Sequence, residues 1–174
     1  MDEKQILEIY KYGDDVLKLK AEEIKNIDEK IIKLRQHMIE TMHESSNAIG
    51  LAAPQVGESL QLSVIDISRG ADENELFVLL NPEILEAEGS DVDEEGCLSF
   101  PGISVPVKRN THIFLRNYDL DGKESRLEIE GYLARVIQHE IDHLLGTLII
   151  DRVSPLKKQM MKKDIKRLKK NGEW

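Results

Sequence analysis

The stretch GYLARVIQHEIDHLLG, residues 131–146, decides how the rest of the sequence is interpreted. It predicts a helix from Tyr132 to Leu145, because Gly146 is a natural stop just past a helix end. In such a helix His139 and His143 lie one turn apart on the same face, so both can bind one metal ion. The stretch therefore indicates a metal site carried by a helix.

Glu140 points to the chemistry of this site. It directly follows the first histidine, where its carboxylate can reach a water in the open position of the metal and take its proton. A catalytic metal normally takes three protein ligands, however, so two histidines leave the site incomplete. Cys97, the single cysteine, is the candidate for the third ligand. A lone cysteine in a cytosolic protein is more often an inert buried residue, and this alternative stays open on the pattern alone.

The composition is that of a globular domain. With 174 residues, 40% of them hydrophobic and 33% charged, the chain is long enough for a sizeable core. No apolar run approaches the length of a membrane span, and the mixed charges of Met1–Lys4 are unlike a signal peptide. A single cysteine excludes an internal disulfide framework. We therefore expect one cytoplasmic domain over residues 1–174.

The net charge of −9 is unevenly distributed. Residues 156–170 contain eight Lys or Arg and one acid, a local charge of +7 that leaves −16 for the remainder. This segment predicts a basic amphipathic helix over 154–170, with Leu156, Met160, Ile165 and Leu168 facing inward. An acidic body argues against a domain that wraps DNA, whereas the basic helix is either a contact for something anionic or simply a solvated face.

Four strands and a third helix are expected. Asp28 is a plausible N-cap for a helix that runs to about His43. Apolar and β-branched residues predict strands at 60–67, 77–80, 112–119 and 126–130, the last two joined by a turn at Asp121-Gly122. Strands that come before the histidine helix indicate an α+β fold, with mixed or antiparallel sheets packed around that helix and not alternating βαβ units.

Three segments in this order, IGLAAPQ at 49–55, EGCLS at 95–99 and QHEIDH at 138–143, strongly resemble the three signature motifs of the peptide deformylases. The resemblance spans most of the chain, and a generic zinc protease would share only the third motif. It implies a hydrolase that removes the N-formyl group from the formylmethionine of newly synthesised proteins and releases formate. A metallopeptidase, or an inactive paralogue that only binds a partner, are the alternatives.

The resemblance also implies roles for individual residues. The metal ligands are Cys97, His139 and His143, and the ion is most often Fe(II) in this family, with Zn, Ni or Co also accepted. Glu140 is then the general base, and later the acid that protonates the departing amine. The donors to the developing oxyanion are the side-chain amide of Gln55 and the backbone N–H of Leu98.

Substrate binding is implied to occur by strand addition. The extended N-terminus of the peptide pairs with backbone near Ile49, Gly50 and Gly96. Its methionine side chain enters a pocket formed by Tyr132, Arg135 and Val136, although an arginine beside an apolar pocket is more often a packed stem with a solvated head. An ion pair between Glu95 and Arg109 is expected to support the Cys97 loop.

One position departs from the family pattern. Ala48 stands where the first motif usually begins with glycine. If that glycine needs a positive φ, alanine is strained by about 1 kcal/mol; if it avoids a clash with substrate, Ala48 narrows the cleft. For partners we expect N-formylmethionyl nascent peptides and a ribosomal contact through the helix at 154–170, neither DNA nor a membrane, and a monomeric enzyme.

Overall fold

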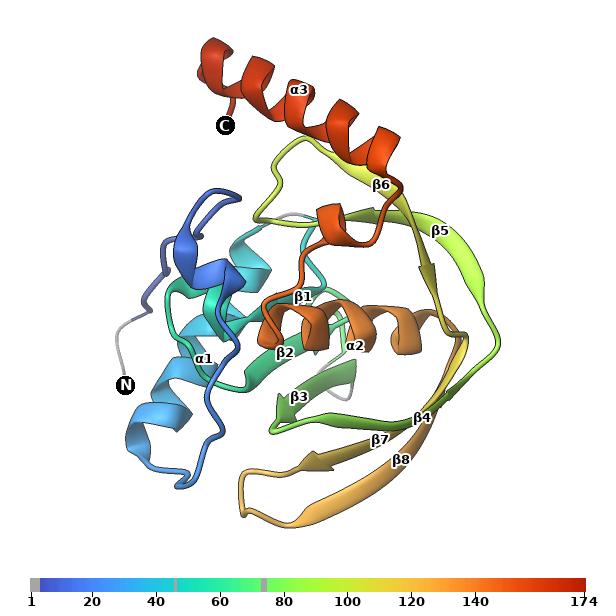
Figure 1. Ribbon diagram of the computed structural model, residues 1–174. Helices are drawn as coiled ribbons and strands as arrows, with labels where there is room; N and C mark the ends of the chain where they lie inside the picture. Colours follow the sequence, from blue (N-terminus) through green and yellow to red (C-terminus); the bar gives the residue numbers. More distant parts are fainter. Residues whose placement is uncertain (1–3, 46, 73–74) are drawn as a thin grey trace.

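The computed structural model describes residues 4–45, 47–72 and 75–174 and shows an α+β fold, as predicted (Figure 1). Met1–Glu3, on which the expectation about a signal peptide rests, lie outside these ranges. Helix α2 (Gly131–Leu144) lies at the centre, between three antiparallel sheets formed by strands β1 to β8. No helix of the described residues is long and apolar enough to cross a membrane.

The first sheet has the strand order β1-β2-β3, from Gly50–Ala52, Leu62–Asp66 and Leu76–Leu80. Successive side chains of a strand point to opposite faces, and both faces of β2 are covered. Val64 packs in one core cluster with Met38 of helix α1 (Glu29–Glu44), whereas Ile65 packs in another with Ile137 of α2. The predicted cap of α1 is confirmed, since Asp28 accepts hydrogen bonds from the N–H groups of residues 30 and 31.

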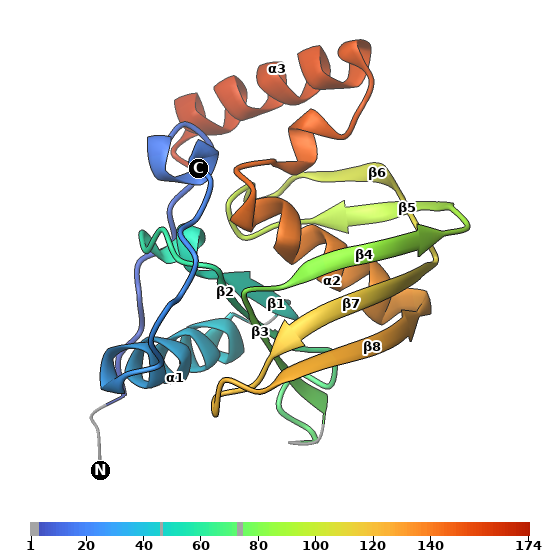
Figure 2. The ribbon, with the colours of Figure 1, turned by 60° about the horizontal axis from the view of Figure 1, so that its bottom comes forward.

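The other two sheets lie against α2 on its far side (Figure 2). One has the order β4-β7-β8, from Glu83–Glu88, His112–Tyr118 and Glu124–Glu130, and contains the predicted hairpin with His112 opposite Glu130. The second pairs β5 (Asp91–Gly96) with β6 (Ser104–Arg109). Four strands, β1, β4, β5 and β6, were not predicted. The carboxylate-rich sequences EILEAE and DVDEEG of β4 and β5 lack the composition typical of strands. Strand β1 has only three residues, and β6 contains Pro106.

Helix α3 (Pro155–Asn171) begins after the N-cap Ser154 and crosses the outside of the molecule (Figure 2). The prediction of its inner face is wrong in part. Leu156 and Met160 are 69% and 50% exposed, whereas Met161 and Ile165 are buried in a cluster with Phe100, Val105 and Ile150. Met160 precedes Met161 by one residue, which is about 100° around a helix, so only one of the two can face the core.

Candidate active site

The three predicted metal ligands converge. Their donor atoms, one each from Cys97, His139 and His143, all lie within 4.8 Å of one another. The Sγ atom of Cys97 is 3.3 Å from Nε2 of His143, and the two imidazole rings are 5.0 Å apart at their centroids. A thiolate and two imidazoles that face a common point are the donor set expected for a transition metal, so these residues fit such an ion.

Glu95 fixes the orientation of His139. A carboxylate only accepts hydrogen bonds, so the 2.9 Å contact between Glu95 Oε2 and His139 Nδ1 places the ring proton on Nδ1 and leaves Nε2 free to bind a metal. The predicted ion pair is also present, since Arg109 donates to both Glu95 oxygens at 2.9 Å. Burial alone raises the pKa of Glu95, but the hydrogen bonds from Arg109 and His139 outweigh it and lower the pKa to about 2.

Asp142 extends this buried network toward α3. It accepts hydrogen bonds from Arg109 and from Arg152, which follows the short helix Ile149–Asp151. Asp142 is thus the second carboxylate that neutralises Arg109, and it does not face the cleft. The sequence singled out Glu95 and Arg109 but gave Asp142 no role, because its partners come from distant parts of the chain.

Glu140 follows His139 on α2 and lines the same cleft. Its Oε2 atom is buried and has no hydrogen-bond partner among the described residues. Burial raises the pKa of this carboxyl to about 7, although the charge of His139 opposes the shift. An unpaired buried carboxylate costs stability and is typical of a functional site, because a pKa near 7 suits a general base.

Gly50 makes room for this carboxylate. A Cβ atom at Gly50 would lie 2.3 Å from Oε1 of Glu140, so a side chain there would displace the Glu140 carboxylate. Strand β1 is at the edge of its sheet and β5 pairs only with β6, so each presents one edge with no strand partner in the described part of the chain. These two edges carry Gly50 and Gly96, which both line the same cleft.

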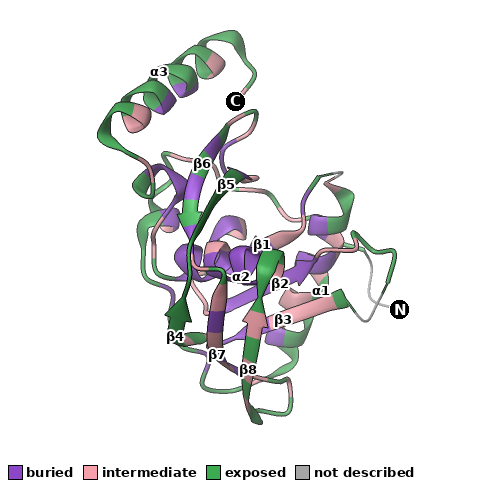
Figure 3. Cartoon of the chain, turned by 90° about the vertical axis from the view of Figure 1, so that its right-hand side faces the viewer, coloured by how far each residue is buried: buried purple, intermediate pink, exposed green. Residues whose placement is uncertain are grey.

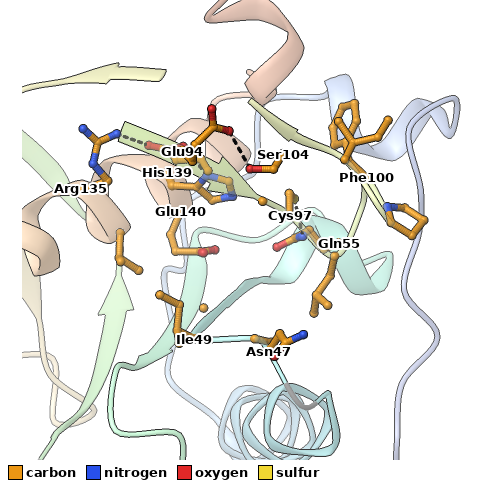
Figure 4. Close-up of a pocket in the computed structure, with 18 of the residues that line it drawn as sticks. Asn47, Ile49, Gln55, Glu94, Cys97, Phe100, Ser104, Arg135, His139 and Glu140 are labelled. Carbon is orange, nitrogen blue, oxygen red and sulfur yellow. Dashed lines mark hydrogen bonds and ion pairs between the residues drawn. The ribbon is translucent and has the colours of Figure 1, made fainter. Parts of the chain in front are cut away.

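The cleft has a volume of about 450 Å³ and brings together residues from β1, β5, the Cys97 loop and α2 (Figure 4). Its lining includes every site residue predicted from the sequence except His143, which is buried behind the others. Those lining residues are Ile49, Gly50, Gln55, Gly96, Cys97, Leu98, Tyr132, Arg135, Val136, His139 and Glu140. Burial colouring shows that α2, which supplies five of them, is the most enclosed helix (Figure 3).

The two groups predicted to donate to an oxyanion, Gln55 and Leu98, both line the cleft. The amide Nε2 of Gln55 lies 3.4 Å from Cys97 Sγ, and its Oε1 accepts from the N–H of Ala52 at 2.9 Å. The backbone N–H of Leu98 makes no hydrogen bond to any residue in the described ranges. Of the two, Gln55 is held at the cleft by its own hydrogen bonds.

The guanidinium of Arg135 is buried, which contradicts the expectation of a solvated head. It donates to Glu95 Oε1 at 2.9 Å and to the carbonyl of Val107 at 2.8 Å, and a third bond goes to the carbonyl of Asp91. Arg135 lines the cleft, but its polar atoms point into the network around Glu95. The apolar wall of the cleft is formed by residues such as Val136 and Ile49.

Ala48 is not strained. The only non-glycine residues with positive φ in the described ranges are Arg69 and Asn81. Ala48 is instead a buried member of the cluster around Met38 and Met42, and it also lines the cleft. The explanation that this position needs glycine for a positive φ therefore does not apply to this chain.

The segments that carry Gln55 and Cys97 are held together by residues that were not predicted from the sequence. The N–H of Tyr10 donates to the carbonyl of Gln55 at 2.8 Å, and the N–H of Tyr12 donates to the carbonyl of Ser99 at 2.9 Å. Tyr12 also stacks on Phe100 of the cleft, with ring centroids 5.1 Å apart. The segment at 10–12 has no regular secondary structure and carries no catalytic residue type, so no local signal marks it.

Comparison with known proteins agrees with this geometry. The sequence model of the family described as Polypeptide deformylase matches residues 6–159. Peptide deformylase of Thermodesulfovibrio yellowstonii is 50% identical over 161 residues, covering 92% of this chain and 97% of its own length. That of Dictyoglomus thermophilum is 52% identical over 147 residues, covering 84% and 92%.

Solved structures agree as well. The crystal structure of a peptide deformylase from Legionella pneumophila has a TM-score of 0.89 at 39% identity, over 97% of this chain and 98% of that one. A peptide deformylase from Synechococcus elongatus, solved in complex with actinonin, has a TM-score of 0.84 at 38% identity, over 95% and 88%. No metallopeptidase is needed to explain the histidine helix: the chain belongs to the polypeptide deformylase family.

Proposed function

We propose that this deformylase acts through a divalent metal held by Cys97, His139 and His143, with Glu140 as the general base and acid. The observation that carries the proposal is the convergence of the three donor atoms beside a buried carboxylate oxygen without a partner. When bound there, a divalent cation supplies a Lewis acid for the formyl oxygen and makes the attacking water more acidic.

Glu140 moves the proton. It takes one from the water whose oxygen attacks the formyl carbon, and it delivers that proton to the amine nitrogen as the C–N bond breaks. The products are formate and a peptide with a free N-terminal methionine. A pKa near 7 lets one carboxyl act first as base and then as acid.

Gln55 and Leu98 stabilise the charge that develops on the formyl oxygen. The amide of Gln55 and the free N–H of Leu98 are both fixed before substrate arrives, so no reorganisation is required at the moment of reaction. Losing one preorganised donor of this kind costs about 10²–10³ in rate.

The peptide binds as a strand between the open edges of β1 and β5. Backbone groups near Ile49, Gly50 and Gly96 then supply affinity with little demand on sequence, as strand addition does elsewhere. The methionine side chain packs on Val136 and on the ring of Tyr132. The guanidinium of Arg135 is already hydrogen-bonded to Glu95 and to the carbonyl of Val107. Arg135 therefore contributes to the site by fixing Glu95 and by offering its aliphatic carbons to the methionine side chain.

Iron(II) is the expected metal, with Zn, Ni or Co as substitutes, because a soft thiolate with two imidazoles accepts all of them. Anaerobic purification, metal analysis and a formyl-Met-Ala-Ser assay on one sample test the proposal. Activity should follow metal content when the metal is removed by a chelator and restored, and Cys97→Ser should lose most of both. Turnover that survives complete metal removal would overturn it.

We further propose that residues 1–174 form one catalytic domain that acts as a cytoplasmic monomer. The packing of Met161 and Ile165 of α3 with Phe100 of the cleft supports a single domain. The cations of α3 would dock on the ribosome where formylated chains emerge, and the exposed Leu156 and Met160 extend that outer surface. Neither DNA nor a membrane is expected as a partner.

A further inference from the structure

Ser99 holds a buried hydroxyl that the proposed mechanism does not use. It is fully buried and lies two residues after Cys97. Its Oγ atom contacts two groups, the carbonyl of Tyr10 at 2.7 Å and Nε2 of Gln55 at 3.2 Å. Burying a hydroxyl is costly unless it is hydrogen-bonded, so both contacts stabilise its place in the fold.

The partners of the Ser99 hydroxyl determine which of its two hydrogen bonds it donates and which it accepts. A carbonyl oxygen only accepts, so the single proton of the Ser99 hydroxyl is directed at Tyr10. Ser99 Oγ therefore offers a lone pair to Gln55, and the group of the carboxamide that faces it must be the NH₂ group. At the other end, the N–H of Ala52 needs an acceptor and finds Oε1 of Gln55 at 2.9 Å.

The two ends of a carboxamide have nearly the same shape, so only their partners decide which way it points. Ser99 and Ala52 bind opposite ends with opposite polarity. The remaining N–H of Gln55 then faces Cys97 Sγ at 3.4 Å, on the side of the metal ligands and of the cleft. A flipped amide would present an acceptor to the developing oxyanion.

We propose that Ser99 is a positioning residue for deformylation, which orients the carboxamide of Gln55 so that its N–H group and not its oxygen faces the formyl oxygen. The N-terminal segment is part of this arrangement. The carbonyl of Tyr10 accepts a hydrogen bond from the Ser99 hydroxyl, and the N–H of Tyr10 donates to the carbonyl of Gln55, so Tyr10 contacts both residues. The inference rests on the proposed role of Gln55 as an oxyanion donor.

A double-mutant cycle tests it, with kcat, KM, metal content and thermal stability measured for each variant on formyl-Met-Ala-Ser. Ser99→Ala should lower kcat about tenfold and leave KM and metal content within about twofold, because the donor is misoriented but still present. In a Gln55→Ala background the same change should have no further effect on kcat. Ser99→Thr, which keeps the hydroxyl, should restore most of the rate.

Ser63→Ala is the matched control, because Ser63 is equally buried and its hydroxyl has no partner among the described residues. It should leave kcat unchanged. Equal losses from Ser99→Ala with and without Gln55, or a raised KM at constant kcat, would overturn the positioning role. A wild-type kcat in Gln55→Ala would instead refute the donor role on which the inference rests, and with it the inference. Should Ser99→Ala not fold, Ser99→Cys provides the same test, since a thiol is a weak acceptor.

Discussion

Helices α2 and α3 use charged residues in opposite ways. Around α2, Glu95, Arg109, Arg135 and Asp142 are all buried, and each carboxylate has at least two cationic partners. On α3 most cations lie on the exposed face (Figure 3). Among the described residues, α3 pairs Lys158 with Asp151 and Arg167 with Asp164, and both pairs lie at the surface.

The difference shows which charges the fold depends on. A buried charge is tolerated only when it is paired, and removing one partner leaves an uncompensated ion. An exposed pair contributes little, because water screens it. The network beside α2 therefore fixes the site, whereas the exposed cations of α3 contribute little to the stability of the fold.

Glu95→Gln should break the buried network and give the largest loss of stability. The lowering of the Glu95 pKa from 4.5 to about 2 corresponds to about 3 kcal/mol of stability at neutral pH, which glutamine cannot supply. This loss agrees with the cost of breaking a buried pair. Metal affinity should fall by about 10–100-fold, because His139 loses the group that orients it. Chemical denaturation and metal titration measure both effects; a loss below about 1 kcal/mol would show that the network is dispensable.

The lowered pKa of Glu95 also predicts a loss of stability at acidic pH. The folded pKa of Glu95 is lowered to about 2, so its contribution is fully present above pH 4.5 and is lost as the pH falls toward 2. Unfolding free energy measured across this range should drop more steeply in the wild type than in Glu95→Gln. Parallel curves would exclude Glu95 as the cause.

Met161→Ala and Met160→Ala compare the two faces of α3 directly. Met161 is 2% exposed, and its truncation should cost about 2–3 kcal/mol of stability, the lower part of the range for buried methionine. Met160 is half exposed, so its truncation should stay within about 0.5 kcal/mol. Equal losses in thermal or denaturant unfolding would mean that the helix is rotated from its described position.

Lys163→Glu combined with Lys166→Glu should have the smallest effect on the enzyme itself. Both lysines are exposed, so stability and turnover of formyl-Met-Ala-Ser should be nearly unchanged. Ribosome binding in a pelleting assay should weaken about tenfold at low salt and less as salt is raised. Lys25→Glu combined with Lys33→Glu changes the net charge equally at exposed sites away from α3, and this variant should bind as the wild type does. Equal weakening by the two double variants would assign the effect to net charge.

The sequence predicted the parts of this site that follow from spacing within one element or from a shared family pattern. His139 and His143 follow from one helical turn, and Cys97 and Gln55 from their motifs. The burial of Arg135, the role of Asp142 and the contacts of Ser99 could not be predicted, since each depends on which distant backbone the fold brings alongside. Met160 was placed on the wrong face because α3 offers two apolar stripes, and only the position of Phe100 and Ile150 decides between them.

Glu140 is the residue that we propose to move the proton, in a metal site built by its neighbours. Metal per chain and kcat for formyl-Met-Ala-Ser, measured on anaerobically prepared Glu140→Ala and wild-type protein, test it most directly. We expect equal metal content in the two proteins and a rate lower by about 10²–10⁴ in the variant, the range for general acid–base catalysis. A metal-loaded Glu140→Ala enzyme that turns over at the wild-type rate would contradict it.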